Sequence, residues 1–168
     1  MTEQYRDPII FKGLKIKAAG VLLYKVDDNG KIWILLRTTK NKGFSDLGGK
    51  NEPGVDRTPL DLAIRKCVSE SCEIFEEEQL KQAIDPNFYD HIKESKYILY
   101  YAKIDDIDVN EMQSRDVEMQ ECHEYKWFPQ DYNFIINKQD EEPNAQHIHF
   151  RLFNLKKFIQ KIVQKERE

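Results

Sequence analysis

The sequence has few cysteines and no long apolar stretch. Its three cysteines, Cys67, Cys72 and Cys122, include no Cys-x-x-Cys pair. The sequence therefore predicts neither a disulfide framework nor a cysteine zinc site, and a reducing compartment fits best. No apolar run approaches the roughly 18 residues that a membrane-spanning helix needs. Residues 1–8 are polar and lack the apolar core of a secretory signal, so we expect a cytoplasmic or nuclear protein with no membrane partner.

The sequence also lacks an overall positive charge. The 168 residues carry a formal net charge of -4, so a nucleic acid would need a local basic patch to bind. The length and the 40% hydrophobic fraction predict a single domain over residues 1–168, large enough to bury a core. Within it, we expect residues 1–12 to be an N-terminal extension.

The first half of the chain has the pattern of a β-hairpin followed by a helix. Residues 14–26 and 31–38 are rich in apolar and β-branched side chains, and an Asn-Gly turn at residues 27–30 separates them. Residues 44–49 then lead into a predicted turn at Gly48-Gly49.

A helix is predicted from Thr58 to about Ser71. Thr58 is a suitable N-cap, Pro59 suits the first helical position, and Asp61 stands where a capping box has an acid. The apolar side chains repeat at helical spacing at Leu60, Ala63, Ile64, Cys67 and Val68.

The second half predicts several further elements. A short helix is expected over residues 76–84, strands over 96–104 and 124–129, and an amphipathic C-terminal helix over 149–166. Residues 105–119 are acidic and loop-like, and residues 130–146 are polar and irregular. Two such long polar loops weakly favour contacts with a partner. This order predicts an α/β protein with a mixed β-sheet and helices on both faces.

From Gly48 onwards the chain reads GGKNEPGVDRTPLDLAIRKCVSESCEI and resembles the Nudix box. That box is Gly, five residues, Glu, seven residues, and then Arg-Glu-aliphatic-any-Glu-Glu-any-Gly-aliphatic. Gly48-Gly49-Lys50, Thr58-Pro59 and Ala63-Ile64-Arg65 stand where the family commonly has such residues. The resemblance implies a Nudix-type α/β/α sandwich and, in active members, hydrolysis of nucleoside-diphosphate-linked substrates with Mg²⁺ or Mn²⁺.

The departures from the box concern its acidic residues. The stretch from Gly49 to Arg65 is two residues too long, so the first glutamate falls on Val55 or Arg57 depending on the direction of counting. Of the three later glutamates, the first two are replaced by Lys66 and Ser69 and the third is kept as Glu70, and the glycine that ends the helix is replaced by Cys72.

These replacements bear directly on metal binding. A helix brings carboxylates to one spot at i, i+3 and i+4, and Mg²⁺ and Mn²⁺ require such oxygen ligands. Here only Glu70 remains, and Lys66 adds a cation that repels a metal by about 4 kcal/mol per unit charge at about 4 Å and an effective dielectric near 20. Glu73, three residues after Glu70, is a candidate replacement ligand, as are Glu52 and Glu118, Glu121 and Glu124.

The candidate site residues follow from this comparison. Arg65 and Glu70 are the candidate catalytic residues, and Glu70 and Glu73 the candidate metal ligands. The candidate ligand-binding residues are Gly48, Gly49, Lys50, Glu52 and Lys66. Lys66 is predicted either to replace the metal electrostatically, so that a phosphate-bearing small molecule or nucleotide binds without hydrolysis, or to point to solvent.

Three functions stay open. The chain is a degenerate Nudix-fold protein that binds a ligand, a protein or an RNA; or an active divergent hydrolase that uses Mg²⁺ or Mn²⁺; or a structural subunit of a larger assembly. Two other features have more ordinary explanations. The aromatic residues of the predicted strands fit a core better than base stacking, and His147-x-His149 is weak evidence for a metal.

Overall fold

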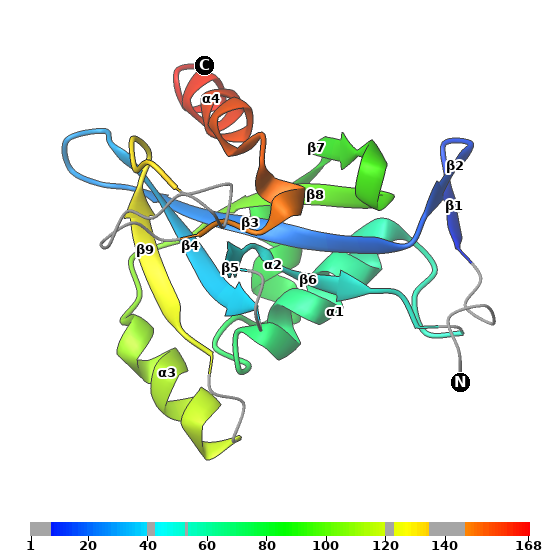
Figure 1. Cartoon of the computed structure of the whole chain (residues 1–168), viewed down its shortest axis with the longest axis horizontal. Helices are drawn as coiled ribbons and strands as arrows, with labels where there is room; N and C mark the ends of the chain where they lie inside the picture. Colours follow the sequence, from blue (N-terminus) through cyan, green and yellow to red (C-terminus); the bar gives the residue numbers. More distant parts are fainter. Residues whose placement is uncertain (1–7, 40–42, 53, 120–122, 135–146) are drawn as a thin grey trace. The chain divides into compact units, whose positions relative to one another are not determined.

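The computed structural model describes residues 8–39, 43–52, 54–119, 123–134 and 147–168. The chain divides into two compact units, whose helices and strands are labelled in Figure 1. Unit 1 comprises Met1–Leu22 and Leu47–Ala102, and unit 2 comprises Leu23–Asp46 and Lys103–Glu168. The extension of one domain over the whole chain stays a prediction.

Unit 1 contains the sheet strands nearest the Nudix-like stretch and two helices. A small hairpin, β1 (Ile9–Phe11) with β2 (Leu14–Ile16), precedes the first half of β3 (Ala18–Val26). In this unit β3 lies between β6 (Leu47–Lys50) and β8 (Tyr97–Lys103), and β7 (Ile84–Ile92) pairs with β8. The short 3₁₀ helix η2 (Lys93–Ser95) joins these last two strands, and α1 (Pro59–Glu70) packs against β6 and α2 (Glu77–Ala83).

Unit 2 contains the second half of β3, which pairs antiparallel with β4 (Ile32–Thr39). On its other side β4 pairs with β5 (Gly43–Ser45) and with β9 (Tyr125–Pro129), also antiparallel. The helices of this unit are α3 (Val109–Glu118), which packs on β9, the 3₁₀ helix η3 (Phe150–Leu152) and α4 (Leu155–Glu166).

The α/β class with a mixed sheet is confirmed. The strand pairs β3–β4, β3–β6 and β7–β8 are antiparallel. Strands β3 and β8 run parallel, because Lys17 N–H donates to Lys96 C=O just before both strands, and Ile104 N–H, just after β8, donates to Tyr24 C=O near the end of β3. Among the described residues, no helix is long and apolar enough to cross a membrane.

The predicted hairpin and the predicted helix are both present. Asp27 fixes the hairpin turn: one carboxylate oxygen accepts the Asn29 and Lys31 N–H groups and the other accepts Trp33 Nε1–H. Helix α1 opens at Thr58, whose hydroxyl accepts the Asp61 N–H at 3.1 Å. Its core face is Pro59, Leu62, Ala63, Ile64 and Cys67; Leu60 and Val68 are half-buried.

Two predictions about elements were wrong, and one strand was missed. Residues 105–119 contain α3, which Asp108 caps by accepting the Asn110 N–H and which buries Met112 and Asp116. The C-terminal helix begins at Leu155, because residues 147–149 lie extended beside β5: Phe44 N–H donates to His147 C=O, and His149 N–H donates to Phe44 C=O. Strand β7 was not predicted at all.

Candidate functional site

Gly48 and Gly49 belong to strand β6, so the predicted glycine turn was wrong. Gly48 is buried, and a Cβ atom built on it would lie 1.9 Å from Tyr97 Oη and 2.6 Å from Ala19 O. Its role is thus close packing of β6 against β3 and β8. The chain needs a glycine here for space rather than for a turn.

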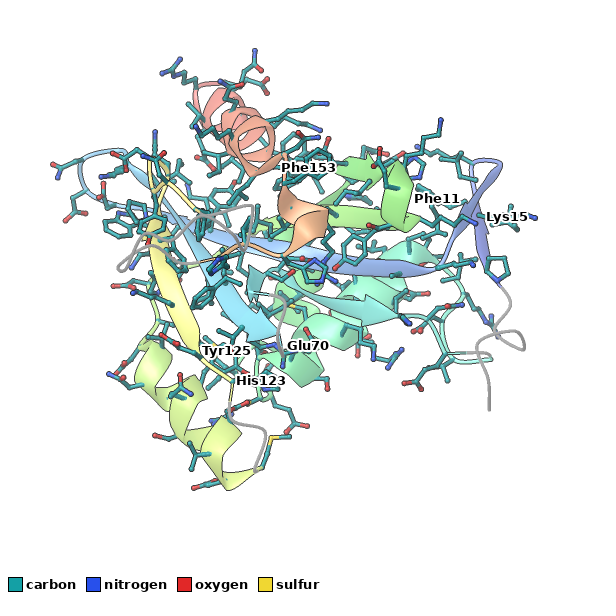
Figure 2. The ribbon with its side chains drawn as sticks, viewed as in Figure 1. Phe11, Lys15, Glu70, His123, Tyr125 and Phe153 are labelled. Atoms are coloured by element: carbon teal, nitrogen blue, oxygen red, sulfur yellow. The ribbon has the colours of Figure 1, made fainter. Side chains whose placement is uncertain are left out.

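Glu70 connects the end of α1 to this strand (Figure 2). Its Oε2 accepts the Gly48 N–H at 2.8 Å, and the side chain is half-buried. A charge-assisted hydrogen bond of this kind is stronger than one between neutral groups. One carboxylate oxygen of the predicted metal ligand is therefore engaged by the backbone of β6.

Lys66 lies directly over Gly49. A Cβ atom built on Gly49 would be 3.0 Å from Lys66 Cε and 3.4 Å from its Nζ. The ammonium is also 4.0 Å from Glu52 Oε1, and 24% of the side chain is exposed. The structure thus places Lys66, Gly49 and Glu52, three of the predicted ligand-binding residues, side by side at one face formed by β6 and α1.

Arg65 is held by an acid that counting along the box missed. Its Nε and Nη2 donate to the two carboxylate oxygens of Asp56 at 2.8 and 2.7 Å, and Nη1 lies 3.5 Å from Glu52 Oε1. Burial would raise the pKa of Asp56, but the hydrogen bonds from Arg65 and from the Glu52 N–H outweigh it and hold that pKa below its ordinary value. Asp56 stands between Val55 and Arg57, the two positions that the counts gave.

The contact with Asp56 also changes the pKa of Arg65. The hydrogen bond to Asp56, and to a smaller degree the nearby carboxylate charges, raise the pKa of the Arg65 guanidinium, although burial opposes the shift. The fork geometry orients the guanidinium between Asp56 and Glu52. Arg65 therefore restrains these two acids, and through Glu52 the surroundings of Lys66.

Glu73 does not share the helical face of Glu70. Helix α1 ends at Glu70, and Cys72 and Glu73 both have left-handed backbones, with φ of 55° and 62°. Left-handed residues turn the chain out of the helix, so the i, i+3 argument for Glu73 was wrong. Lys50, another predicted ligand-binding residue, follows the two glycines at the end of β6 and is exposed.

The donors on this face do not fit a divalent cation. They comprise the Glu70 carboxylate, already bonded to a backbone N–H, and the Glu52 carboxylate beside the Lys66 ammonium, whereas Mg²⁺ and Mn²⁺ are bound mainly through several carboxylates. Throughout the part of the chain that the structure describes, no group of three or more His, Cys, Asp or Glu side chains is placed to hold a metal ion.

Unit 2 holds a polar pair that the sequence did not suggest. Asp116 of α3 is almost fully buried and accepts the His123 N–H at 2.6 Å, with His123 Nδ1 at 2.9 Å and the Tyr125 hydroxyl at 3.4 Å. His123 lies just before β9, and Tyr125 is the first residue of that strand (Figure 2). The two contacts from His123 and the one from Tyr125 satisfy the Asp116 carboxylate, which would otherwise be costly to bury. These contacts join α3 to β9.

The remaining candidates are structural. Tyr97, Tyr100 and Tyr101 are buried in β8 and Phe128 in β9, as the core interpretation predicted. His149 is buried, and its Nδ1 accepts the Arg151 N–H at 3.1 Å. The candidate ligand Glu121 lies outside the described residues.

Comparisons with known proteins support the fold and not a particular activity. No family model matches the chain, and no curated protein matches it. Among solved structures, it is similar to RenU, a Nudix hydrolase from M. smegmatis, with a TM-score of 0.55 and 14% identity over 94% of this chain and 95% of that one. It is also similar to NrtR of Shewanella oneidensis, with a TM-score of 0.53 and 12% identity over 90% of this chain and 65% of that one.

Proposed function

We propose that this chain, which has the fold of Nudix hydrolases, binds a phosphate-bearing small molecule or nucleotide through Lys66. The site is the face formed by β6 and α1. The observation that carries the proposal is the position of Lys66: its side chain lies over Gly49 and within 4.0 Å of Glu52. A cation therefore lies on the helix face where the Nudix box has the glutamate that directly follows its arginine.

Electrostatics supports binding without hydrolysis. A lysine ammonium attracts phosphate as a compact point charge. It has no coordinated water whose pKa it could lower, so it does not generate the hydroxide that a metal supplies for phosphate-ester cleavage. Glu70 supports the site structurally, because one oxygen of its carboxylate accepts the Gly48 N–H of β6.

Arg65, predicted as catalytic, is proposed to be a positioning residue. Its guanidinium is held by both oxygens of Asp56. By its contacts with Asp56 and Glu52, it keeps Glu52 near Lys66 and limits the directions that the ammonium can take. Lys50 is exposed beside the site and supplies a second cation for a ligand with more than one phosphate.

The proposal is tested by calorimetric titration with pyrophosphate in the presence of EDTA. We expect saturable binding by the wild-type protein and binding weaker by about tenfold or more for Lys66→Ala, since a hydrogen bond to a charged group is lost. Lys93→Ala, a change at an exposed lysine of η2, is the matched control and should stay within about twofold.

A screen of nucleoside diphosphate derivatives with Mg²⁺ and Mn²⁺ separates this function from the hydrolase. We expect little or no turnover. Robust metal-dependent turnover that Glu70→Gln abolishes would replace the proposal with an active divergent hydrolase. Absence of both turnover and pyrophosphate binding would favour the structural subunit instead.

A further inference from the structure

We infer that unit 2 has a second binding site, which accepts a nucleotide. A cavity of about 690 Å³ lies between α4 and residues 130–133, which follow β9. This volume is within the range of about 300–1,000 Å³ typical of small-molecule sites. The cavity contains no residue of the face formed by β6 and α1, so the inference does not depend on the function proposed above.

Four side-chain amides line this cavity: Gln130, Asn133, Gln160 and Gln164. Gln130 is oriented by the protein, because its Oε1 accepts the Ile32 N–H at 2.7 Å, which directs the two amide N–H donors elsewhere. The other three are exposed. A carboxamide offers one acceptor and two donors in a plane, which matches the edges of nucleobases.

Two cations stand at the same cavity, Lys156 and Arg167 of the α4 region. Within the described parts of the chain, neither makes an ion pair. The one acidic residue of the lining, Asp131, is 3.4 Å from Lys31 Nζ. The positive charge of Lys156 and Arg167 is therefore available for an anionic group such as phosphate.

An aromatic ring and an apolar strip complete the lining. Tyr132 is held in an aromatic cluster, with its ring centroid 5.0 Å from that of Phe128 and 4.7 Å from that of Phe134. Ile159 and Val163 of α4 supply the apolar surface. A fixed ring next to apolar side chains is suited to the flat face of a base.

These features together specify a nucleotide rather than another ligand. A neutral sugar would leave Lys156 and Arg167 unused, and an inorganic anion would leave the amides and the ring unused. A nucleotide uses all of them, with its phosphate at the cations and its base among the amides. The same chemistry is found in a free nucleotide and in one unit of a single-stranded RNA.

The test is calorimetric titration with AMP and with UMP, in a Lys66→Ala background so that the face of unit 1 contributes little. We expect saturable binding of at least one of the two nucleotides. Lys156→Ala and Gln160→Met should each weaken it by about tenfold. Lys157→Ala, which removes the neighbouring lysine outside the lining, should change it by less than about twofold.

A second arm identifies the source of the nucleotide. Fluorescence anisotropy with labelled oligo-uridylate and oligo-adenylate should show much tighter, salt-dependent binding if the ligand is a strand, and binding no tighter than the mononucleotides if it is a free nucleotide. The inference is overturned if neither nucleotide binds, if inorganic phosphate competes as well as the nucleotides, or if the Lys156 and Lys157 variants lose affinity equally.

Discussion

Gly48 and Gly49 are neighbours in β6, but their surroundings differ. The missing Cβ of Gly48 would meet backbone atoms of Ala19 and Gly20 at 2.6 Å, whereas that of Gly49 would meet the flexible end of Lys66. We predict that Gly48→Ala lowers the free energy of unfolding by about 3 kcal/mol and Gly49→Ala by less than about 1 kcal/mol. Urea denaturation measures both, and equal losses would contradict the packing described for β6.

Glu70 has a structural role that differs from metal binding: its side chain accepts a backbone hydrogen bond from β6. Removal of its carboxylate leaves the N–H of the buried Gly48 without this acceptor. Glu70→Ala is therefore expected to cost about 1.5–3 kcal/mol of stability. Glu70→Gln keeps an acceptor oxygen and should cost less than about 1 kcal/mol.

The comparison of the two Glu70 variants by thermal and urea unfolding is informative in itself. If Ala and Gln destabilise equally, the negative charge matters and the hydrogen bond does not. If neither destabilises, Glu70 is available for a ligand, and the engagement of its carboxylate by β6 is of no consequence.

At the scale of elements, the pair Asp56–Arg65 ties residues 54–56 to α1. The pKa of Asp56 lies below its ordinary value, so in acid the unfolded chain takes up the proton first. Stability from this pair is therefore fully present above the ordinary carboxyl pKa near 4 and is lost as the pH falls through the lower folded pKa.

Asp56→Asn tests this linkage. We expect the variant to be less stable than the wild type by about 2 kcal/mol at pH 7, with a gap that narrows steadily below about pH 4. Urea unfolding between pH 2 and pH 7 gives the two curves. Asp28→Asn, a change in the exposed hairpin turn, should stay within about 0.5 kcal/mol of the wild type throughout, and a constant gap for Asp56→Asn would contradict the linkage.

Elements could be predicted from sequence where local signals agreed with tertiary packing. Helix α1 combines an N-cap, a proline at its first position and an apolar face. Helix α3 was missed because its acidic composition hides the two side chains that it buries, Met112 and Asp116. Strand β7 was missed because it contains Pro86 and pairs, in the described part of the sheet, with β8 alone, as an edge strand does.

The candidate site was predicted in part, for a similar reason. Spacing on one helix placed Lys66 and Glu70 correctly on α1, because helical geometry fixes such neighbours. Asp56 could not be found by counting, since the loop before α1 is two residues longer than the box and its acid lies between the two counts. The engagement of Glu70 with Gly48 depends on a strand 22 residues away, which periodicity does not show.

For the molecule as a whole, net charge complicates any metal titration. The formal net charge of -4 attracts divalent cations to the surface without a defined site. The variant Lys66→Glu with Ser69→Glu changes this charge by -2 and -1, to -7. A control with the same charge is therefore required, and Lys93→Glu with Gln82→Glu provides it at two exposed positions outside α1.

The rebuilt helix face is predicted to bind Mg²⁺ and the control is not. The two introduced carboxylates would join that of Glu70 at the spacing that brings three carboxylates together, and the ammonium that repels the metal would be gone. Calorimetry with MgCl₂ and MnCl₂ should show one saturable site in the Lys66→Glu, Ser69→Glu variant and only weak, unsaturable heat in the control and the wild type. If the double variant and its control behave alike, this face of α1 cannot hold a metal even with its acids restored. The idea that Lys66 stands in place of a metal then fails, because no metal position exists for its charge to replace.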